Sequence, residues 1–302
     1  MNTKTLNRFN DALIKYVFAR EERKGVTLSL INAVLAAQDL PLLVDLQFQD
    51  REIDGDDPED KESRLDIHAR SSDGAIVNVE VQATSLASMG KRALFYWSRL
   101  YSLKRGEAYW RLPRTISINI LDFELFPELP GDFLNTYAVL NTKHSTHRLT
   151  DDLEIHFLEV PKFAERVLDV NALDAIGRWM AYFSKATSEK DLQAIAGEEP
   201  MIQEALKAER IFAQTPDLIS AYDMAEKARL DRLAREQFVR EEGLVMGRAE
   251  GEAKGRAEER SEIALKLLSL QMPVSQIAEV TGLSADEIRK IQCTRPNTPI
   301  CP

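Results

Sequence analysis

The chain has 302 residues, 44% of them hydrophobic, and a formal net charge of −10, which suits one large globular domain with appendages or two modest ones. It has no run of about 18 apolar residues that could cross a membrane, and its N-terminus lacks the apolar core of a signal peptide. We therefore expect a soluble, cytoplasmic protein with no membrane partner. Cys293 and Cys301 lie in a polar, proline-rich tail, which indicates neither a disulfide framework nor a metal clip.

Helix and strand patterns alternate up to about residue 165. Helices are predicted at residues 7–20, 27–38 and 89–105, the two strands of a hairpin at 63–70 and 75–82, and further strands at 115–123, 135–141 and 153–160. Thr27 is a candidate cap for the second helix. This order predicts an α/β fold in residues 1–165, with a mixed β-sheet flanked by helices.

Charge is segregated along this region. Residues 50–62 carry a net charge of −6 and are typical of a solvated loop, whereas residues 91–114 carry +6. The overall negative charge argues weakly against nucleic acid as a partner, because phosphate contacts rest on Lys and Arg. The basic segment still predicts one of two surfaces, the solvated face of a helix or a face that contacts phosphate.

Beyond residue 165 the pattern becomes helical and increasingly charged. We expect a helical region at residues 166–242, with helices at 171–186, 199–214 and 216–242. Residues 243–302 are expected to form a separate segment: a glycine-periodic charged helix, a small helix-turn-helix-like pair and a disordered tail. In that last segment, glycine recurs every four residues, at Gly243, Gly247, Gly251 and Gly255. A glycine in a helix costs about 1 kcal/mol relative to alanine. The spacing therefore favours either close backbone approach between helices of two chains or a semi-flexible linker.

The end of the chain predicts a helix at residues 274–281, a turn at Gly282, and a second helix capped by Ser284 with Glu287 three residues on. This is the shape of a helix-turn-helix, but the second helix carries only two basic residues with which to read DNA. Packing or self-association is the favoured use, and we expect a homo-oligomer formed through the C-terminal helices.

The hairpin carries the candidate chemistry. Strand alternation places Asp66 on the polar face of one strand and both Glu80 and Gln82 on the polar face of the next. A three-residue loop ending in a left-handed Gly74 would bring the apolar faces together through the pairs Leu65 with Val81, Ile67 with Val79 and Ala69 with Val77. Asp66 would then lie opposite Glu80, with Cβ atoms about 4.5–5.5 Å apart.

Two carboxylates at that distance repel each other unless one is protonated or a cation lies between them. Mg²⁺ suits the position, because it binds one or two carboxylates together with water and phosphate oxygens. The uncharged amide of Gln82 could hold the attacking water or a phosphate oxygen. The alternative is that these polar side chains form only the solvent face of an amphipathic hairpin.

Several segments resemble the PD-(D/E)XK nuclease-family transposases, also called Rpn-type recombination-promoting nucleases. The matching stretches are NDALIKYVFA (10–19), SLINAVL (29–35), SRLDIHARSSDGAIVNVEVQ (63–82), KRALFYWSRLYSLKRGEAYWRL (91–112) and ISINILDFELF (116–126). The glycine-periodic ending also looks like that family's. The resemblance implies a restriction-endonuclease-like core, followed by an all-helical C-terminal region, and metal-dependent cleavage of DNA associated with recombination or mobile elements.

By matching position, the resemblance implies that Asp66 and Glu80 bind the metal and that Gln82 completes the catalytic set. Gln82 stands where the superfamily has lysine, although glutamine is itself common at this position in the family, and without lysine's charge the metal would have to contribute more to activating water. The implied enzyme is a Mg²⁺-dependent endodeoxyribonuclease. The alternative is a non-catalytic DNA-binding or scaffolding protein that keeps the fold and oligomerises through its C-terminal helices.

Three further residues are candidates for support of this site. Asp11 matches a family acid on the first helix, although an i,i+4 pair with Lys15 is the favoured interpretation. Arg92 and Tyr96 lie about one turn apart on the basic helix and are weaker candidates for holding phosphate or supporting the hairpin.

Overall fold

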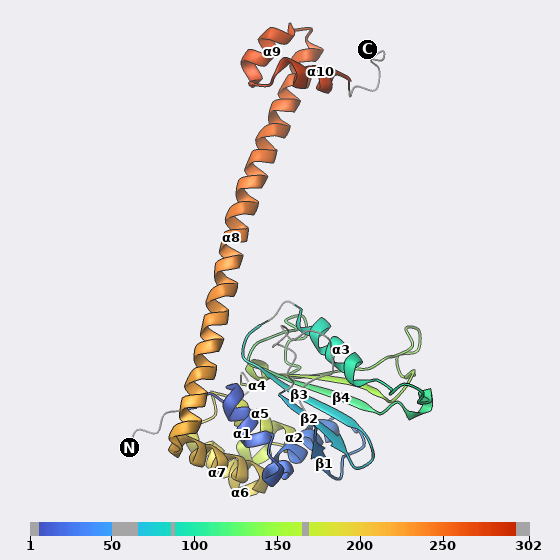
Figure 1. The fold of residues 1–302 in the computed structure, drawn as a ribbon, viewed down its shortest axis with the longest axis vertical. Helices are drawn as coiled ribbons and strands as arrows, with labels where there is room; N and C mark the ends of the chain where they lie inside the picture. The colour runs from blue at the N-terminus through green and yellow to red at the C-terminus, as the bar shows by residue number, and fades with distance from the viewer. Residues whose placement is uncertain (1–5, 50–65, 86–87, 165–168, 294–302) are drawn as a thin grey trace. The chain divides into compact units, whose positions relative to one another are not determined.

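The computed structural model describes residues 6–49, 66–85, 88–164 and 169–293 (Figure 1). The acidic run at 50–62 and Leu65 lie outside the described residues. The chain divides into two compact units, Met1–Arg229 and Leu230–Pro302. The boundaries predicted at residues 165/166 and 242/243 stay predictions.

The first unit is built on one six-stranded sheet with strand order β1-β2-β3-β4-β6-β5. The strands are β1 (Leu46–Phe48), β2 (Ile67–Ser71), β3 (Ile76–Gln82), β4 (Thr115–Leu121), β5 (Leu134–Tyr137) and β6 (Leu153–Glu159). β3, β4 and β6 run parallel, whereas β1, β2 and β5 join the sheet antiparallel. The predicted α/β fold with a mixed sheet is confirmed.

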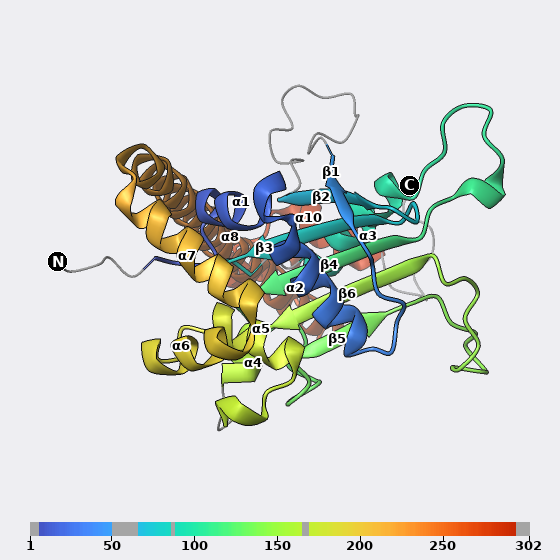
Figure 2. The same ribbon diagram turned by 90° about the horizontal axis from the view of Figure 1, so that it is seen from below.

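Helices of the first unit cover both faces of this sheet (Figures 1 and 2). Over both units, the described helices are α1 (Asp11–Phe18), α2 (Lys24–Ala36), α3 (Met89–Leu100), α4 (Val160–Ala164), α5 (Ala175–Phe183), α6 (Glu189–Glu198), α7 (Pro200–Gln214), α8 (Pro216–Ser269), α9 (Val274–Thr281) and α10 (Ala285–Cys293), with 3₁₀ turns η1 (Glu21–Arg23), η2 (Tyr109–Arg111) and η3 (Val170–Ala172). Because β4 lies between the two helical layers, every residue of TISINIL is buried.

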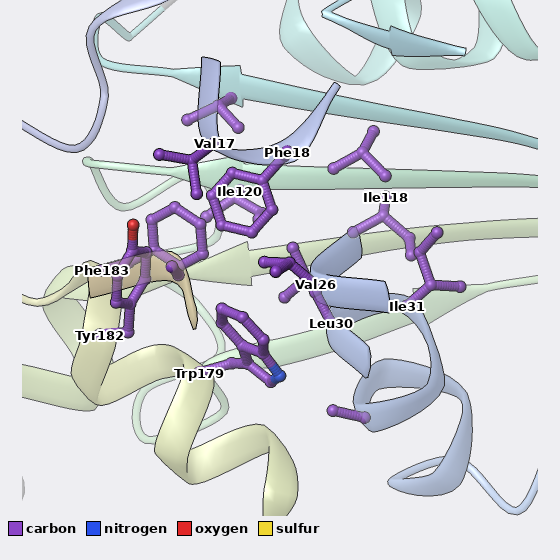
Figure 3. Close-up of a cluster of buried hydrophobic side chains, with 14 of the residues drawn as sticks. Val17, Phe18, Val26, Leu30, Ile31, Ile118, Ile120, Trp179, Tyr182 and Phe183 are labelled. Atoms are coloured by element: carbon purple, nitrogen blue, oxygen red, sulfur yellow. The ribbon is translucent and has the colours of Figure 1, made fainter. Parts of the chain in front are cut away.

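The main core lies between the sheet and α1, α2 and α5. Phe18 of α1 stacks on Phe183 with ring centroids 5.8 Å apart, and its other ring contacts include Trp179 and Tyr182 (Figure 3). These aromatic rings meet Ile118 and Ile120 of β4 within one buried cluster. α1 is thereby fixed against the sheet face that carries the apolar side chains of the hairpin.

α3 covers the opposite face and runs antiparallel to β3 and β4. At its start, Met89 packs in a buried cluster with Leu121, at the end of β4. At its last residue, Leu100 packs against Ile76, at the start of β3. Between them, the indole N–H of Trp97 donates to the carbonyl of Thr115 (2.8 Å). The N-terminal end of α3 therefore lies over the end of the sheet at which β3 finishes.

Some predicted details of this unit are wrong. Thr27 does not cap α2, because η1 leads directly into a helix that begins at Lys24; Thr27 is buried inside α2 and donates to the carbonyl of Phe18. β1 and α6 were not predicted, and β1 is too short at three residues to show an alternating pattern.

In the second unit, the described residues form the greater part of α8, then α9 and α10. The helix that was predicted to end at residue 242 continues through the four periodic glycines to Ser269. Gly282 adopts φ 69° after α9, and the capping box is confirmed, since Ser284 Oγ accepts the N–H of Glu287 (3.3 Å) and the N–H of Ser284 donates to Glu287 (2.8 Å). Ala264, Ile277 and Ile288 form the small core. Among the described helices, none is long and apolar enough to span a bilayer.

Candidate active site

The register of the β2–β3 hairpin determines where the candidate side chains lie. Ile67 pairs with Val79 and Ala69 with Val77, as predicted. The connecting loop contains Gly74 with φ 95°, the left-handed conformation that the predicted register requires. Asp66 lies one residue before β2, so the same register continues to a position opposite Glu80.

Strand alternation in β3 then separates two sets of side chains. The valines of β3 belong to the main core on the side of α1, α2 and α5. Asn78, Glu80 and Gln82 alternate with them and face the side covered by α3. Glu80 is 2% exposed, because β2 and β4 flank it in the sheet and α3 lies above it. The predicted solvent face is therefore a covered polar layer, and the interpretation as an exposed amphipathic hairpin is wrong.

Asp66 is tied to β3 by its side chain. The backbone N–H of Val81 donates to Oδ2 of Asp66 (2.8 Å). This hydrogen bond fixes the Asp66 carboxyl beside the end of the strand that carries Glu80 and Gln82. One carboxylate oxygen of Asp66 thereby has a defined role in holding the site together.

The two carboxyl groups disturb each other's protonation. Burial and the negative charge of Glu80 raise the pKa of Asp66 well above its usual value. Burial raises the pKa of Glu80 to about 7, although Arg92 and the nearby amides of Asn78 and Gln82 act in the opposite direction. Both shifts mean that the pair is poorly compensated by positive charge when both groups are ionised.

Several buried polar atoms around Glu80 lack a hydrogen-bond partner within the part of the chain that the structure describes. They are Oε1 of Glu80, both amide atoms of Asn78, Oδ1 of Asn119 and Nε of Arg92. Asn119 lies beside Glu80 on β4 in the sheet register. Unpaired buried polar atoms are costly, and here they gather around a carboxyl group whose charge Arg92 compensates only in part.

This donor set fits a hard divalent cation with a partly hydrated shell. Two carboxyl groups are available, together with neutral amide oxygens, and Mg²⁺ is typically bound by one or two carboxylates while keeping several waters. A cage made entirely of protein ligands is not available, because the described residues include no group of three His, Cys, Asp or Glu side chains suited to a metal. The residues therefore fit Mg²⁺ better than a closed structural metal site.

Asp11 and Lys15 approach the site from α1. They form the predicted i,i+4 ion pair, with Nζ of Lys15 2.5 Å from Oδ1 of Asp11. Both also act on Asp66, whose pKa Asp11 raises and Lys15 lowers. The ion pair and a place beside the site are thus compatible. Lys15 was expected only as the partner of Asp11, and its charge next to Asp66 depends on how α1 packs on the sheet.

The two candidate residues on α3, Arg92 and Tyr96, have different surroundings. Arg92 is half-buried, its charge lowers the pKa of Glu80, and its guanidinium carbon lies 5.1 Å from the ring centroid of Tyr96. Tyr96 is buried with Ile76 and Leu100, so it packs α3 against the start of β3. Asn78 was not a predicted site residue. The sequence feature that could have indicated Asn78 is an amide side chain two residues before Glu80, on the same face of a strand rich in valine.

A family model described as PD-(D/E)XK nuclease family transposase matches residues 8–236. The match spans α1, the whole sheet, α3 and the helices up to the first part of α8. Comparison with curated proteins and with solved structures gives no match to the chain.

Proposed function

Because the chain belongs to the PD-(D/E)XK nuclease family transposases, we propose that it is a Mg²⁺-dependent DNA endonuclease whose site is formed by Asp66, Glu80 and Gln82. The family makes the chain a nuclease-fold protein linked to transposition, and divalent metal ions are general among such nucleases. The particular substrate, metal and residues are our proposal.

One observation carries this proposal. Two carboxyl groups from neighbouring strands meet in a place shielded from water, and each has a raised pKa. Oε1 of Glu80 has no hydrogen-bond partner among the described residues. A protein seldom keeps such an arrangement for stability alone, since burying an uncompensated charge is expensive. A site that binds a cation explains both features.

The residues have distinct roles in this proposal. A hard divalent cation, when bound, supplies a Lewis acid for the phosphoryl oxygen and lowers the pKa of water. Asp66 and Glu80 hold that cation, with Asp66 oriented by the N–H of Val81. Gln82, half-buried at the end of β3, orients the attacking water or a phosphate oxygen through its amide. Arg92 supplies positive charge next to Glu80 on the side of α3.

Lys15 offers the positive charge that Gln82 lacks. Its side chain is 29% exposed and acts on Asp66 from α1. A lysine ammonium near the metal-binding acids would stabilise negative charge that develops on the phosphoryl group. In this proposal, Lys15 on α1 supplies the positive charge that the superfamily's lysine supplies from the position of Gln82 on β3. The ion pair with Asp11 holds Lys15 in place.

Plasmid cleavage tests the assignment. We expect purified protein to nick supercoiled plasmid with Mg²⁺ and not with EDTA, and Asp66→Asn and Glu80→Gln variants to lose that activity and the calorimetric signal of metal binding. Asp45→Asn is the matched control, because Asp45 is an exposed acid that pairs with Lys24. If the two site variants nick as fast as the wild type, the assignment is wrong.

The same experiment addresses the alternative function. Gln82 stands where the superfamily has lysine, and its uncharged amide is the feature that favours a chain that keeps the fold without catalysis. DNA binding with a steep dependence on salt, without metal uptake or cleavage, would select a DNA-binding or scaffolding role.

We also propose that the chain forms a homo-oligomer through its C-terminal helices. α8 exposes Leu244, Val245 and Met246 at 66%, 69% and 58%, and the periodic glycines have open space around them. Consecutive large apolar residues on an exposed helix suit contact with a second copy.

A further inference from the structure

Two aromatic side chains project from η2, the turn between α3 and β4. Tyr109 is 87% exposed and Trp110 is 79% exposed, whereas the chain's other two tryptophans, Trp97 and Trp179, are 8% and 1% exposed. The guanidinium carbon of Arg111 lies 5.0 Å from the ring centroid of Trp110. Adjacent aromatic rings that contribute nothing to the core indicate a surface that binds something.

The surroundings of this turn are basic. Residues 91–114 contain seven Lys or Arg residues and one acid, in a chain whose net charge is −10. Lys104 and Arg105 precede the aromatic pair, and both are exposed. Within the part of the chain that the structure describes, neither forms an ion pair. The positive charge is therefore available to an anionic partner.

α3 extends this surface toward the candidate active site. Lys91, Phe95 and Arg99 are exposed at i, i+4 and i+8, so they form one stripe along the outer face of the helix. Phe95 is 57% exposed. The 12 residues of α3 span about 18 Å. The stripe starts over the end of β3 where Glu80 and Gln82 lie, and it ends near the start of β4, where η2 is attached.

We propose that this basic and aromatic surface, formed by the α3 stripe and by Tyr109 and Trp110, binds single-stranded DNA, with unpaired bases stacked on the two η2 rings. The proposal rests on the proposed nuclease function and narrows its substrate to DNA with an unpaired segment. That segment lies about 18 Å, the length of α3, from the phosphodiester that is cut.

The chemistry of the surface favours unpaired bases over the alternatives. In a duplex the base faces are covered by their neighbours, so exposed rings at the tip of a turn find no partner there, whereas an unpaired base offers a π-face to Tyr109 and Trp110. Lys and Arg residues follow the phosphates in the same arrangement. Tryptophan and tyrosine beside basic residues would also suit an anionic lipid surface, so binding to lipid vesicles is one of the outcomes that the test below distinguishes.

Fluorescence of the intact chain tests the proposal directly, because Trp110 is the exposed tryptophan. In EDTA, which prevents cleavage, we expect a mixed-sequence single-stranded oligonucleotide to quench the red-shifted part of the emission. The same sequence as a blunt duplex should bind without that quenching. Trp110→Phe should bind the single strand and lose the quenching signal.

Affinity measurements by anisotropy complete the test. Tyr109→Ala/Trp110→Ala should weaken single-strand binding by roughly 5- to 100-fold and duplex binding by less than about threefold. Phe238→Ala, at an aromatic of α8 that is 64% exposed, is the matched control and should leave single-strand binding unchanged. Circular dichroism of each variant should match the wild type, because neither η2 ring is part of the core.

Three results would overturn the proposal: single-strand affinity that survives the double substitution, equal losses for single strand and duplex, or a blue shift of Trp110 with anionic phosphatidylserine vesicles and no response to oligonucleotide. Binding and quenching as expected, combined with no cleavage in Mg²⁺, would leave this surface intact and count against the nuclease function alone.

Discussion

Glu80 is an acid that the fold keeps partly protonated near neutral pH. Its pKa of about 7 lies above the ordinary glutamate value of 4.5. Between these two pH values the folded chain keeps a proton that the unfolded chain has released, so raising the pH favours unfolding. The stability associated with Glu80 is therefore complete below about pH 4.5 and is lost as the pH rises through 7. Asp66, whose pKa is also raised, contributes in the same direction.

Glu80→Gln should remove this dependence. Without divalent metal at pH 8, we expect the variant to be more stable than the wild type by roughly 1 to 3 kcal/mol, and at pH 4.5 we expect the two to be similar. Urea unfolding at both pH values measures the difference. Mg²⁺ should stabilise the wild type at pH 8 and leave the variant nearly unchanged. A variant that is less stable than the wild type at pH 8 in EDTA would show that ionised Glu80 does not destabilise the folded chain.

Lys15 is the residue that supplies positive charge in place of a lysine at position 82 in the proposed site. Lys15→Met should lower the rate of single-turnover DNA cleavage by roughly 100-fold, the loss typical of removing one group that stabilises developing charge, and Lys15→Arg should retain more activity. Binding of DNA in EDTA should change little. Lys24→Met is the control, because Lys24 also lies on an N-terminal helix and pairs with an exposed acid, Asp45. Equal rates for Lys15→Met and Lys24→Met would exclude the role.

Among the elements of the first unit, a buried ion pair holds the end of β6, where α4 begins. The ammonium of Lys162 donates to Glu159 (3.1 Å) and to the carbonyls of Phe126 and Leu129, while Glu159 accepts the N–H of Leu125 (2.7 Å). Lys162 and Glu159 are both buried. The pair thus joins β6 and α4 to the loop that follows β4.

Lys162→Met should destabilise the first unit by about 3–5 kcal/mol, because Glu159 would be left as a buried charge without its cation. Chemical denaturation of the full chain measures the loss. Lys185→Met provides the comparison, since Lys185 is 63% exposed in its ion pair with Asp122, and it should cost no more than about 1 kcal/mol. Similar losses in the two variants would mean that burial does not set the strength of the Lys162 pair.

The hairpin was predictable because its register follows from two local features, the alternation of valines in β3 and a turn that needs a left-handed glycine. Contacts between distant segments were not. Lys15 and Arg92 reach the carboxyl groups only because α1 and α3 pack on opposite faces of the sheet. The continuity of α8 across residue 242 was missed for a different reason. Glycine lowers helix propensity by about 1 kcal/mol per residue, but the neighbouring residues still favour helix strongly enough to continue it.

In the whole molecule, the periodic glycines of α8 bear on the two interpretations drawn from the sequence, which are close backbone approach between helices of two chains and a semi-flexible linker. All four are helical, and a Cβ built on any of them meets no other described atom within 4 Å. Nothing within the described chain therefore requires glycine at these positions. Each costs about 1 kcal/mol of helix stability, which contact with a second copy would explain through close backbone approach.

Replacing Gly243, Gly247, Gly251 and Gly255 together with alanine should therefore increase helix content and weaken self-association. We expect light scattering to give an oligomeric mass for the wild type and a largely monomeric one for the variant at the same concentration, because four added methyl groups keep the helices apart. Gly197→Ala, in α6 and also with open space at its Cβ, should gain up to about 1 kcal/mol and keep the wild-type mass. If the fourfold variant also keeps that mass and melts at a higher temperature, the glycines belong to a single solvated helix and the apolar residues of α8 must associate, if at all, without them.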